Sequence, residues 1–219
     1  MNAREVFDRF VSVIFPQRCL QCDDAVAFDD FLCAKCRFVP VGMVELLFAN
    51  RLSGIAGVLE YSGERRSLVL KIKDGPPARV CEFFAGEMFK VLAQHWAGVG
   101  FDAVVPVPTT NAKMLSRGFN QVDLLARPLG KLAEIPVLPN ALRREESSKT
   151  QHELSRGQRE ENARLSYKIN RPDAVAGQVV LLLDDLLTTG YTISACADCL
   201  LDAGAAKVYA LCAAATPLH

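Results

Sequence analysis

The stretch that decides the fold reads Val179-Val180-Leu181-Leu182-Leu183-Asp184-Asp185-Leu186-Leu187-Thr188-Thr189-Gly190-Tyr191-Thr192. Its five apolar residues at 179–183 predict a buried strand that carries two carboxylates to its C-terminal end. A hydroxyl-rich loop comes next, and residues 192–203 have the spacing of a helix that ends at Gly204. A strand, a loop and a helix in this order are typical of an α/β protein.

The segments on either side repeat this alternation. Apolar runs predict strands at residues 53–61, 101–108 and 207–214, and helical spacing predicts helices at 64–73, 79–96 and 121–133. Alternating strands and helices imply a mostly parallel sheet that is covered by helices. We therefore expect an α/β fold of this kind over most of the chain.

Length and composition set limits on the protein class. The 219 residues suffice for one α/β domain and a small accessory module, and 50% apolar with 23% charged residues is ordinary globular usage. The formal net charge is zero, so binding of nucleic acid or anionic lipid would need a local patch. Apolar runs are too short for a membrane span or a signal peptide, and a cytoplasmic location is expected.

The N-terminal region has its own pattern. Residues 1–15 have amphipathic helical spacing that stops before Pro16. Two Cys-x-x-Cys units separated by ten residues then supply four thiols, those of Cys19, Cys22, Cys33 and Cys36. This spacing predicts a closed, structural Zn²⁺ site, the alternative being four reduced cysteines in a small apolar module. We expect this module to occupy residues 1–50 and the α/β domain residues 51–219.

The remaining four cysteines are expected to be packing residues. Cys196 and Cys199 also have Cys-x-x-Cys spacing, but they lie in the helix predicted after residue 191, where two ligands alone make a poor metal site. Cys81 and Cys212 lie in apolar surroundings in the sequence. We interpret Cys196 and Cys199 as residues that pack against the sheet, and Cys81 and Cys212 as small buried hydrophobic residues.

The loop after the acidic pair predicts a site for a phosphorylated sugar. Backbone N–H groups at a helix start and the hydroxyls of Thr188, Thr189 and Thr192 can bind a phosphate, which Gly190 lets approach closely. Asp184 and Asp185 could hold sugar hydroxyls or a hydrated Mg²⁺. The alternative is an ordinary turn with acidic capping residues. No Gly-x-x-x-x-Gly-Lys-Ser/Thr pattern occurs, which argues against a nucleotide hydrolase.

These residues resemble a known family. The 179–192 run resembles the phosphoribosyl pyrophosphate motif of type I phosphoribosyltransferases. The double knuckle, residues 105–108 and 117–121, and a block that includes Thr150, Gln151, Leu154, Arg159 and Asn162 resemble the ComF family. The resemblance covers the chain from about residue 15 to 214, and it implies a Rossmann-like type I phosphoribosyltransferase fold with an N-terminal zinc-binding module.

The resemblance also implies roles for individual residues. It makes Asp184 and Asp185 the catalytic pair that meets the ribose hydroxyls of phosphoribosyl pyrophosphate, with Mg²⁺ as cofactor. The loop at 188–192 would bind the 5′-phosphate, and the turn from Pro106 to Thr110 would approach pyrophosphate. The polar segment 143–162 would cover the site. The expected substrate-binding residues are Pro106, Val107, Pro108, Thr109, Arg117, Thr188, Thr189, Gly190, Tyr191 and Thr192.

Three basic residues have two interpretations each or depart from the family pattern. Arg117 either contacts a phosphate or is an exposed side chain at a helix start with a glycine kink. Lys73 resembles a family residue, and it could equally be a solvated lysine at a helix end. Lys113 stands where the family pattern has Arg, so it keeps the charge without the bidentate fork.

Three functions remain open from the sequence. The chain could be a phosphoribosyltransferase with an unknown acceptor, a regulatory domain that binds the sugar phosphate without turnover, or a ComF-type competence protein that binds single-stranded DNA together with DNA-uptake proteins. Residues 143–171 carry eight basic and five acidic side chains but a single aromatic, Tyr167, which gives DNA binding weak support. Residues 1–50, with five basic and seven acidic side chains, add none.

Overall fold

A computed structural model describes residues 17–37, 44–45, 51–73, 78–145 and 166–216. The predicted helix at 1–15 and the family residues from Thr150 to Asn162 lie outside these ranges. So does the stretch 46–50, at which the predicted boundary between the two domains falls, and that boundary stays a prediction.

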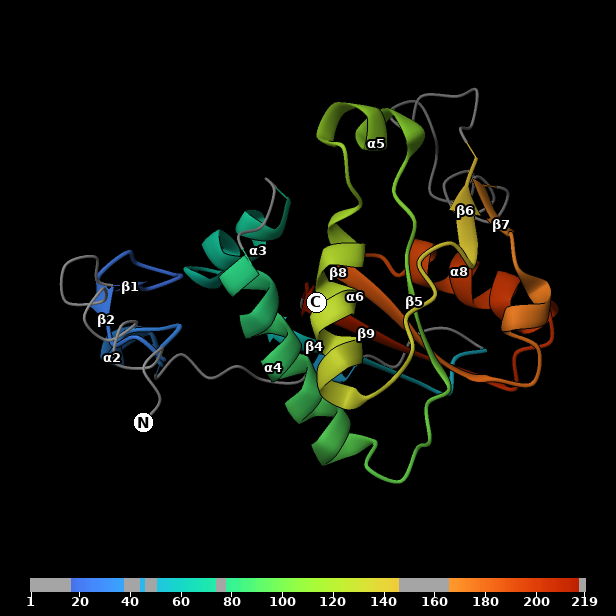
Figure 1. Cartoon of the computed structure of the whole chain (residues 1–219), viewed down its shortest axis with the longest axis horizontal. Helices are drawn as coiled ribbons and strands as arrows, with labels where there is room; N and C mark the ends of the chain where they lie inside the picture. Colours follow the sequence, from blue (N-terminus) through green and yellow to red (C-terminus); the bar gives the residue numbers. More distant parts are fainter. Residues whose placement is uncertain (1–16, 38–43, 46–50, 74–77, 146–165, 217–219) are drawn as a thin grey trace, which may run out of the picture.

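The centre of the molecule is a five-stranded sheet with strand order β3-β4-β9-β8-β5 (Figure 1). Its strands are β3 (Val44–Glu45), β4 (Gly54–Glu60), β5 (Ala103–Pro106), β8 (Val179–Leu187) and β9 (Lys207–Ala215). β3 is antiparallel to β4, and every other pair of neighbours is parallel. The predicted mostly parallel sheet is therefore confirmed.

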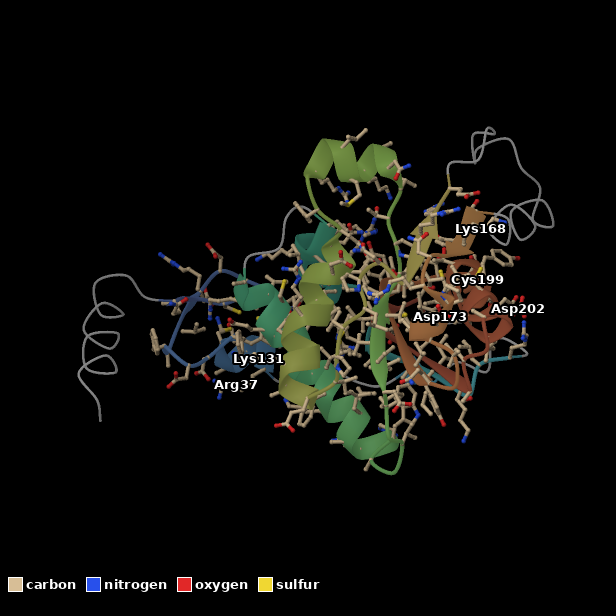
Figure 2. The ribbon with its side chains drawn as sticks, turned by 45° about the vertical axis from the view of Figure 1, so that its right-hand side comes forward. Arg37, Lys131, Lys168, Asp173, Cys199 and Asp202 are labelled. Atoms are coloured by element: carbon tan, nitrogen blue, oxygen red, sulfur yellow. The ribbon has the colours of Figure 1, made fainter. Side chains whose placement is uncertain are left out.

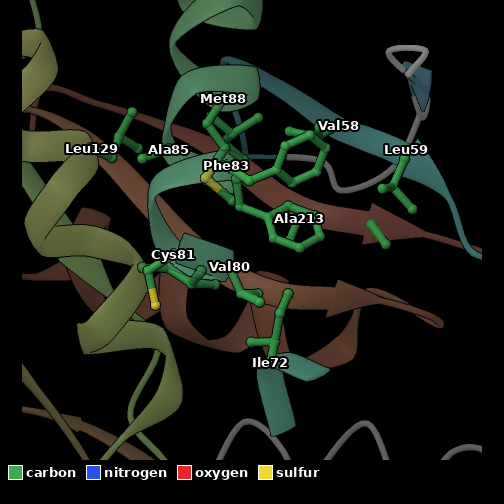
Figure 3. Packing of buried hydrophobic residues seen from close by; sticks show 14 of the residues in the cluster. Val58, Leu59, Ile72, Val80, Cys81, Phe83, Ala85, Met88, Leu129 and Ala213 are labelled. Carbon is green, nitrogen blue, oxygen red and sulfur yellow. The ribbon is translucent and has the colours of Figure 1, made fainter. Parts of the chain in front are cut away.

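Helices cover both faces of this sheet. Leu181 and Leu183 of β8 share one buried cluster with α4 (Ala78–His95) and α6 (Gln121–Ala133). Figure 3 shows part of this packing, with Phe83 and Met88 of α4 near Val58 and Ala213 of the sheet. Val180 and Leu182 belong to a second cluster with α8 (Tyr191–Asp202). Because successive strand residues point to opposite faces, the side chains of β8 contribute alternately to the two buried clusters.

The strand that carries the acidic pair is longer than predicted. The sequence predicts a strand at 179–183, whereas β8 runs from Val179 to Leu187. Asp184 pairs with Cys212 and Leu186 with Ala214, because β9 continues to Ala215 and the two parallel edges stay hydrogen-bonded. Both carboxylates therefore lie within a paired strand rather than at its end, and their backbone is held by the sheet.

A short helix between β5 and α6 was not predicted. α5 (Asn111–Arg117) has no buried residue, and caps at both ends hold it. Thr110 accepts a hydrogen bond from the N–H of Lys113 (3.2 Å), and Gly118 ends the helix at φ 79°, a conformation that glycine adopts at little cost. The interpretation of Arg117 as part of a helix start is wrong, since it is the last residue of α5.

Two smaller pairs of strands flank the sheet. β6 (Leu142–Arg144) pairs with β7 (Tyr167–Ile169), which is followed by the short 3-10 helix η2 (Pro172–Ala174). At the other side of the molecule, β1 (Gln17–Arg18), β2 (Ala25–Val26) and α2 (Ala34–Arg37) form the cysteine module next to α3 (Arg65–Lys73) and α4 (Figure 1).

The cysteine module is fastened to α3 and α4. Lys71 donates to the carbonyl of Leu20 (2.6 Å), and Arg79 donates to that of Asp30 (2.6 Å). Leu20 and Leu32 belong to the same buried cluster as Phe83 of α4. The module thus shares a core with the α/β domain. No helix in the described part of the chain is long and apolar enough to cross a bilayer.

Candidate functional site

The four cysteines of the double knuckle converge on one point. Their sulfur atoms all lie within 4.8 Å of one another, and the Sγ atoms of Cys22 and Cys33 are 3.5 Å apart. Tetrahedral zinc with bonds of about 2.3 Å needs sulfurs about 3.8 Å apart. The cluster therefore fits a metal such as zinc with all four positions taken by protein, which leaves no position for a substrate.

Backbone hydrogen bonds favour the thiolate form of Cys19, whereas burial raises the pKa of the neighbouring Cys36. The N–H of Cys33 donates to the Sγ of Cys19 at 3.3 Å. Burial opposes ionisation of Cys19, but backbone hydrogen bonds from Cys22, Cys33 and Gln21 outweigh it and lower the pKa of this thiol to about 6. A thiolate is the form that binds metal, so the turn geometry prepares at least one ligand in advance.

A second site is a cavity of about 200 Å³ beside the C-terminal half of β8. The parallel register places Pro106 of β5 opposite Leu183 of β8, so the turn after β5 lies beside Asp184 and Asp185 of the longer strand β8. Ligands of open α/β sheets bind at such an end. The cavity is lined by Lys73, Val107, Pro108, Thr109, Lys113, Arg117, Asn120, Gln121, Val122, Arg144, Tyr167, Asp184, Asp185, Leu186 and Thr192.

Asp184 and Asp185 are almost completely buried in the wall of this cavity. Burial raises the pKa of Asp184 well above its ordinary value, and the charge of Asp185 raises it further. The N–H of Asp185 donates to Asp184 Oδ1 (2.9 Å) and Lys73 is near, and both lower that pKa in part. Burial therefore opposes the ionisation of Asp184, and a cation in the cavity would favour it.

A chain of hydrogen bonds joins Asp185 to the end of α5. Gln121 Nε2 donates to Asp185 Oδ2 (3.3 Å), and Arg117 Nη1 donates to Gln121 Oε1 (3.2 Å). Gln121 is buried at the start of α6. This chain sets the position of the Arg117 guanidinium at the cavity wall.

The turn after β5 is hydrogen-bonded both to β8 and to the N-cap residue of α6. The N–H of Val107 donates to the carbonyl of Leu183 (2.8 Å), and Asn120 Nδ2 donates to the carbonyl of Val107 (3.1 Å). Asn120 is also the N-cap of α6, where its Oδ1 accepts from the N–H of Val122 (3.2 Å). One amide side chain therefore fixes the turn to the helix that follows it.

The predicted binding residues divide into two groups. Val107, Pro108, Thr109, Arg117 and Thr192 line the cavity together with the acidic pair. The others, Pro106, Thr188, Thr189, Gly190 and Tyr191, are not in its lining.

Gly190 is nevertheless the N-cap of α8. It adopts φ 76° and provides no side-chain cap, so no N-cap side chain occupies the backbone N–H groups at the start of α8.

Several lining residues were not among the predicted site residues. Asn120 and Gln121 belong to the block at 117–121 that resembles the ComF family. Lys73 had two interpretations, and Lys113 replaces an Arg of the family pattern. Lys73 lies at the cavity and influences Asp184. Tyr167 and Arg144 come from β7 and β6, where nothing in the sequence ties them to the acidic pair.

A larger cavity of about 420 Å³ adjoins the first. The two share Pro108, Thr109, Asn120 and Arg144 in their linings. Polar and apolar groups both line the larger one, and its polar residues include Asp123, whose pKa burial raises to about 6. It provides space next to the acidic pair for a second molecule.

The cysteines outside the knuckles are packing residues, as predicted. Cys81, Cys196 and Cys212 are buried, and burial raises the pKa of each thiol. Cys199 of α8 donates its S–H to the carbonyl of Tyr167 (3.2 Å), which joins α8 to β7 (Figure 2). The raised pKa keeps the thiols of Cys81, Cys196 and Cys212 neutral, which argues against a nucleophilic role for them.

Comparison with known proteins gives matches in both structure and sequence. The solved structures include glutamine phosphoribosylpyrophosphate amidotransferase from B. subtilis (TM-score 0.44, 18% identity, 66% of this chain and 30% of that chain). Adenine phosphoribosyltransferase from Thermoanaerobacter pseudethanolicus is a second (TM-score 0.40, 20% identity, 67% and 83%). No protein-family model matches the chain.

Curated relatives carry the assignment. DNA utilization protein YhgH of Escherichia coli is 36% identical over 111 residues, 51% of this chain and 48%, about half, of the relative. Its Salmonella typhimurium namesake is 28% identical over 197 residues, 89% and 82% of the two chains. Competence protein ComFC of Bacillus subtilis is 25% identical over 174 residues, 79% and 68%. Together with the four-cysteine cluster, these matches support the assignment of the chain to the ComF family.

Proposed function

We propose that this protein binds phosphoribosyl pyrophosphate with Mg²⁺ in the cavity beside β8 and transfers the phosphoribosyl group to an acceptor. The single observation that carries the proposal is the charge arrangement of one small cavity: two buried carboxylates share its lining with four basic side chains, those of Lys73, Lys113, Arg117 and Arg144. A sugar with hydroxyls at one end and anionic groups around it matches such an arrangement.

Each wall of the cavity has a proposed role. Asp184 and Asp185 accept hydrogen bonds from the ribose hydroxyls. The 188–192 loop and the start of α8 bind the 5′-phosphate, with Thr192 nearest the cavity. Lys113, Arg117 and the turn from Pro106 to Thr109 bind the pyrophosphate. The acceptor occupies the neighbouring cavity, which shares this turn.

The acidic pair also fits Mg²⁺. This ion binds through one or two carboxylates together with substrate phosphates. The charge of Asp185 adds to the cost of ionising the buried Asp184, and a divalent cation would lower this cost. When bound with the substrate, Mg²⁺ supplies positive charge to the pyrophosphate that leaves.

Calorimetry with phosphoribosyl pyrophosphate and Mg²⁺ tests the proposal. Wild type should bind, and the double variant Asp184→Asn/Asp185→Asn should bind about 100-fold more weakly, because two charge-assisted hydrogen bonds are lost. The matched control is Asp198→Asn/Asp202→Asn, which removes two carboxylates that pair with Arg51 outside the cavity. Equal binding by wild type and the first variant would contradict the proposal.

A second candidate function is DNA handling. The names of the relatives, DNA utilization protein and competence protein, favour it. Basic side chains at the two cavities could contact phosphates, while the predicted basic residues from Lys149 to Arg164 lie outside the described ranges. A single-stranded oligonucleotide titrated into the same proteins separates the two functions: binding that both double variants retain would place DNA away from the acidic pair.

A further inference from the structure

One polar atom in the cavity wall has no partner. Among the described residues, the hydroxyl of Tyr167 is the sole buried side-chain nitrogen or oxygen without a hydrogen bond. The Tyr167 side chain is 2% exposed, and it lines the cavity beside Asp184 and Thr192. A buried donor without a partner destabilises a folded protein, so each such group needs an explanation.

The surroundings of Tyr167 hold its ring firmly in place. Arg144, its partner across the β6–β7 pair, lies over one face of the ring, 5.3 Å from the centroid. The carbonyl of Tyr167 accepts from Cys199 of α8 (3.2 Å). The ring is therefore fixed by a strand, a cation and a helix, while its hydroxyl alone is left unsatisfied.

We propose that the Tyr167 hydroxyl is a binding group of the cavity, which donates a hydrogen bond to a phosphate oxygen of the bound sugar phosphate. Burial raises the pKa of this phenol to about 12, although the nearby Thr192 side chain lowers it in part, so the group stays a donor. Its neighbour Thr192 lies at the first turn of α8, the end of the cavity assigned to the 5′-phosphate. This inference rests on the proposed function and adds a residue to it.

Tyr167→Phe tests the inference because it removes one oxygen and keeps the ring, its packing and its contact with Arg144. In the absence of ligand, Tm should stay unchanged or rise by about 2–4 °C, because an unsatisfied group is removed. Affinity for phosphoribosyl pyrophosphate and Mg²⁺ should fall by about tenfold or more, since a hydrogen bond to a charged group is lost. A purely structural tyrosine would give the opposite pattern, a lower Tm and unchanged affinity.

Tyr209→Phe is the matched control. Tyr209 lies in β9 within an aromatic group with Trp96 and Phe101, outside the cavity, and its variant should bind like wild type. Binding by wild type and equal binding by Tyr167→Phe would overturn the role of Tyr167 and leave the proposed function standing. Failure of wild type itself to bind would overturn both.

Discussion

The carboxyl group of Asp123 shows how one side chain makes stability depend on pH. It accepts a hydrogen bond from Asn120 (3.1 Å) in the larger cavity. Burial raises its pKa from 3.8 to about 6, against smaller opposite effects of Arg127 and Asn120. Because the folded pKa is above the unfolded one, the ionised carboxylate destabilises the fold.

Asp123→Asn should therefore stabilise the protein in a pH-dependent way. Below pH 3.8 the two proteins should differ little, and the gain should develop up to about pH 6 and then stay constant. After allowance for solvent screening, we expect about 1–2 kcal/mol at pH 7. Urea unfolding at pH 3.5, 5 and 7 measures this, and a gain that is equal at all three values would contradict it.

The sequence predicted some of the residues that line the cavity and not others, and the difference has a physical reason. Asp184, Asp185 and Thr192 lie in one continuous strand-loop-helix run, so their proximity follows from local structure. Tyr167 reaches the same cavity only because β7 pairs with β6 and packs against α8. A contact of this kind depends on tertiary structure, and no spacing in the sequence encodes it.

At the scale of elements, the sequence predicted α6 accurately and did not predict α5. Both outcomes have the same explanation. α6 buries one face and so leaves an apolar period in the sequence, and its observed bounds equal the predicted 121–133. α5 buries nothing and is defined by its caps. Sequence periodicity detects helices that pack against a core and passes over those held at their ends.

The return of the chain from α6 toward β5 depends on a glycine. A Cβ atom at Gly130 would lie 2.5 Å from Val137 Cγ2 and 2.7 Å from the carbonyl oxygen of Ile135. Gly130→Ala should destabilise the fold by about 2 kcal/mol, because the backbone must shift. Thermal unfolding should show Tm lower by about 4–8 °C.

Gly86 in α4 is the matched position. Its Cβ would meet nothing within 4 Å, so Gly86→Ala should raise stability by about 0.5–1 kcal/mol through helix propensity alone. If both variants moved Tm in the same direction, close packing at Gly130 would not be the cause.

At the scale of the whole molecule, the cysteine module and the α/β domain share one core. Cys19, Leu20, Leu32 and Cys36 belong to the cluster that contains α4 and strands of the sheet. We therefore expect metal loss to affect the entire fold, although a module of residues 1–50 separate from 51–219 remains our domain proposal.

Metal analysis should find about one zinc ion per chain. Cys19→Ser/Cys36→Ser should abolish it, and a strong chelator should lower the Tm of the single unfolding transition of the whole protein by several degrees. Cys81→Ala, a buried cysteine outside the cluster, should retain the metal. Full zinc content in the double variant, or an unchanged Tm after metal removal, would disprove the structural role.

The two sides of the cavity beside β8 differ in how firmly they are held. Its acids belong to β8, which is buried over most of its length, whereas Lys113 and Arg117 belong to α5, in which Leu115 is 88% exposed and no residue is buried. A movement of α5 would break its caps and a few hydrogen bonds. A movement of β8 would disrupt both buried clusters to which it contributes. The α5 side of the cavity can therefore shift more easily than the β8 side. Lys113 and Arg117 can adjust to anions of different length, while Asp184 and Asp185 stay in place.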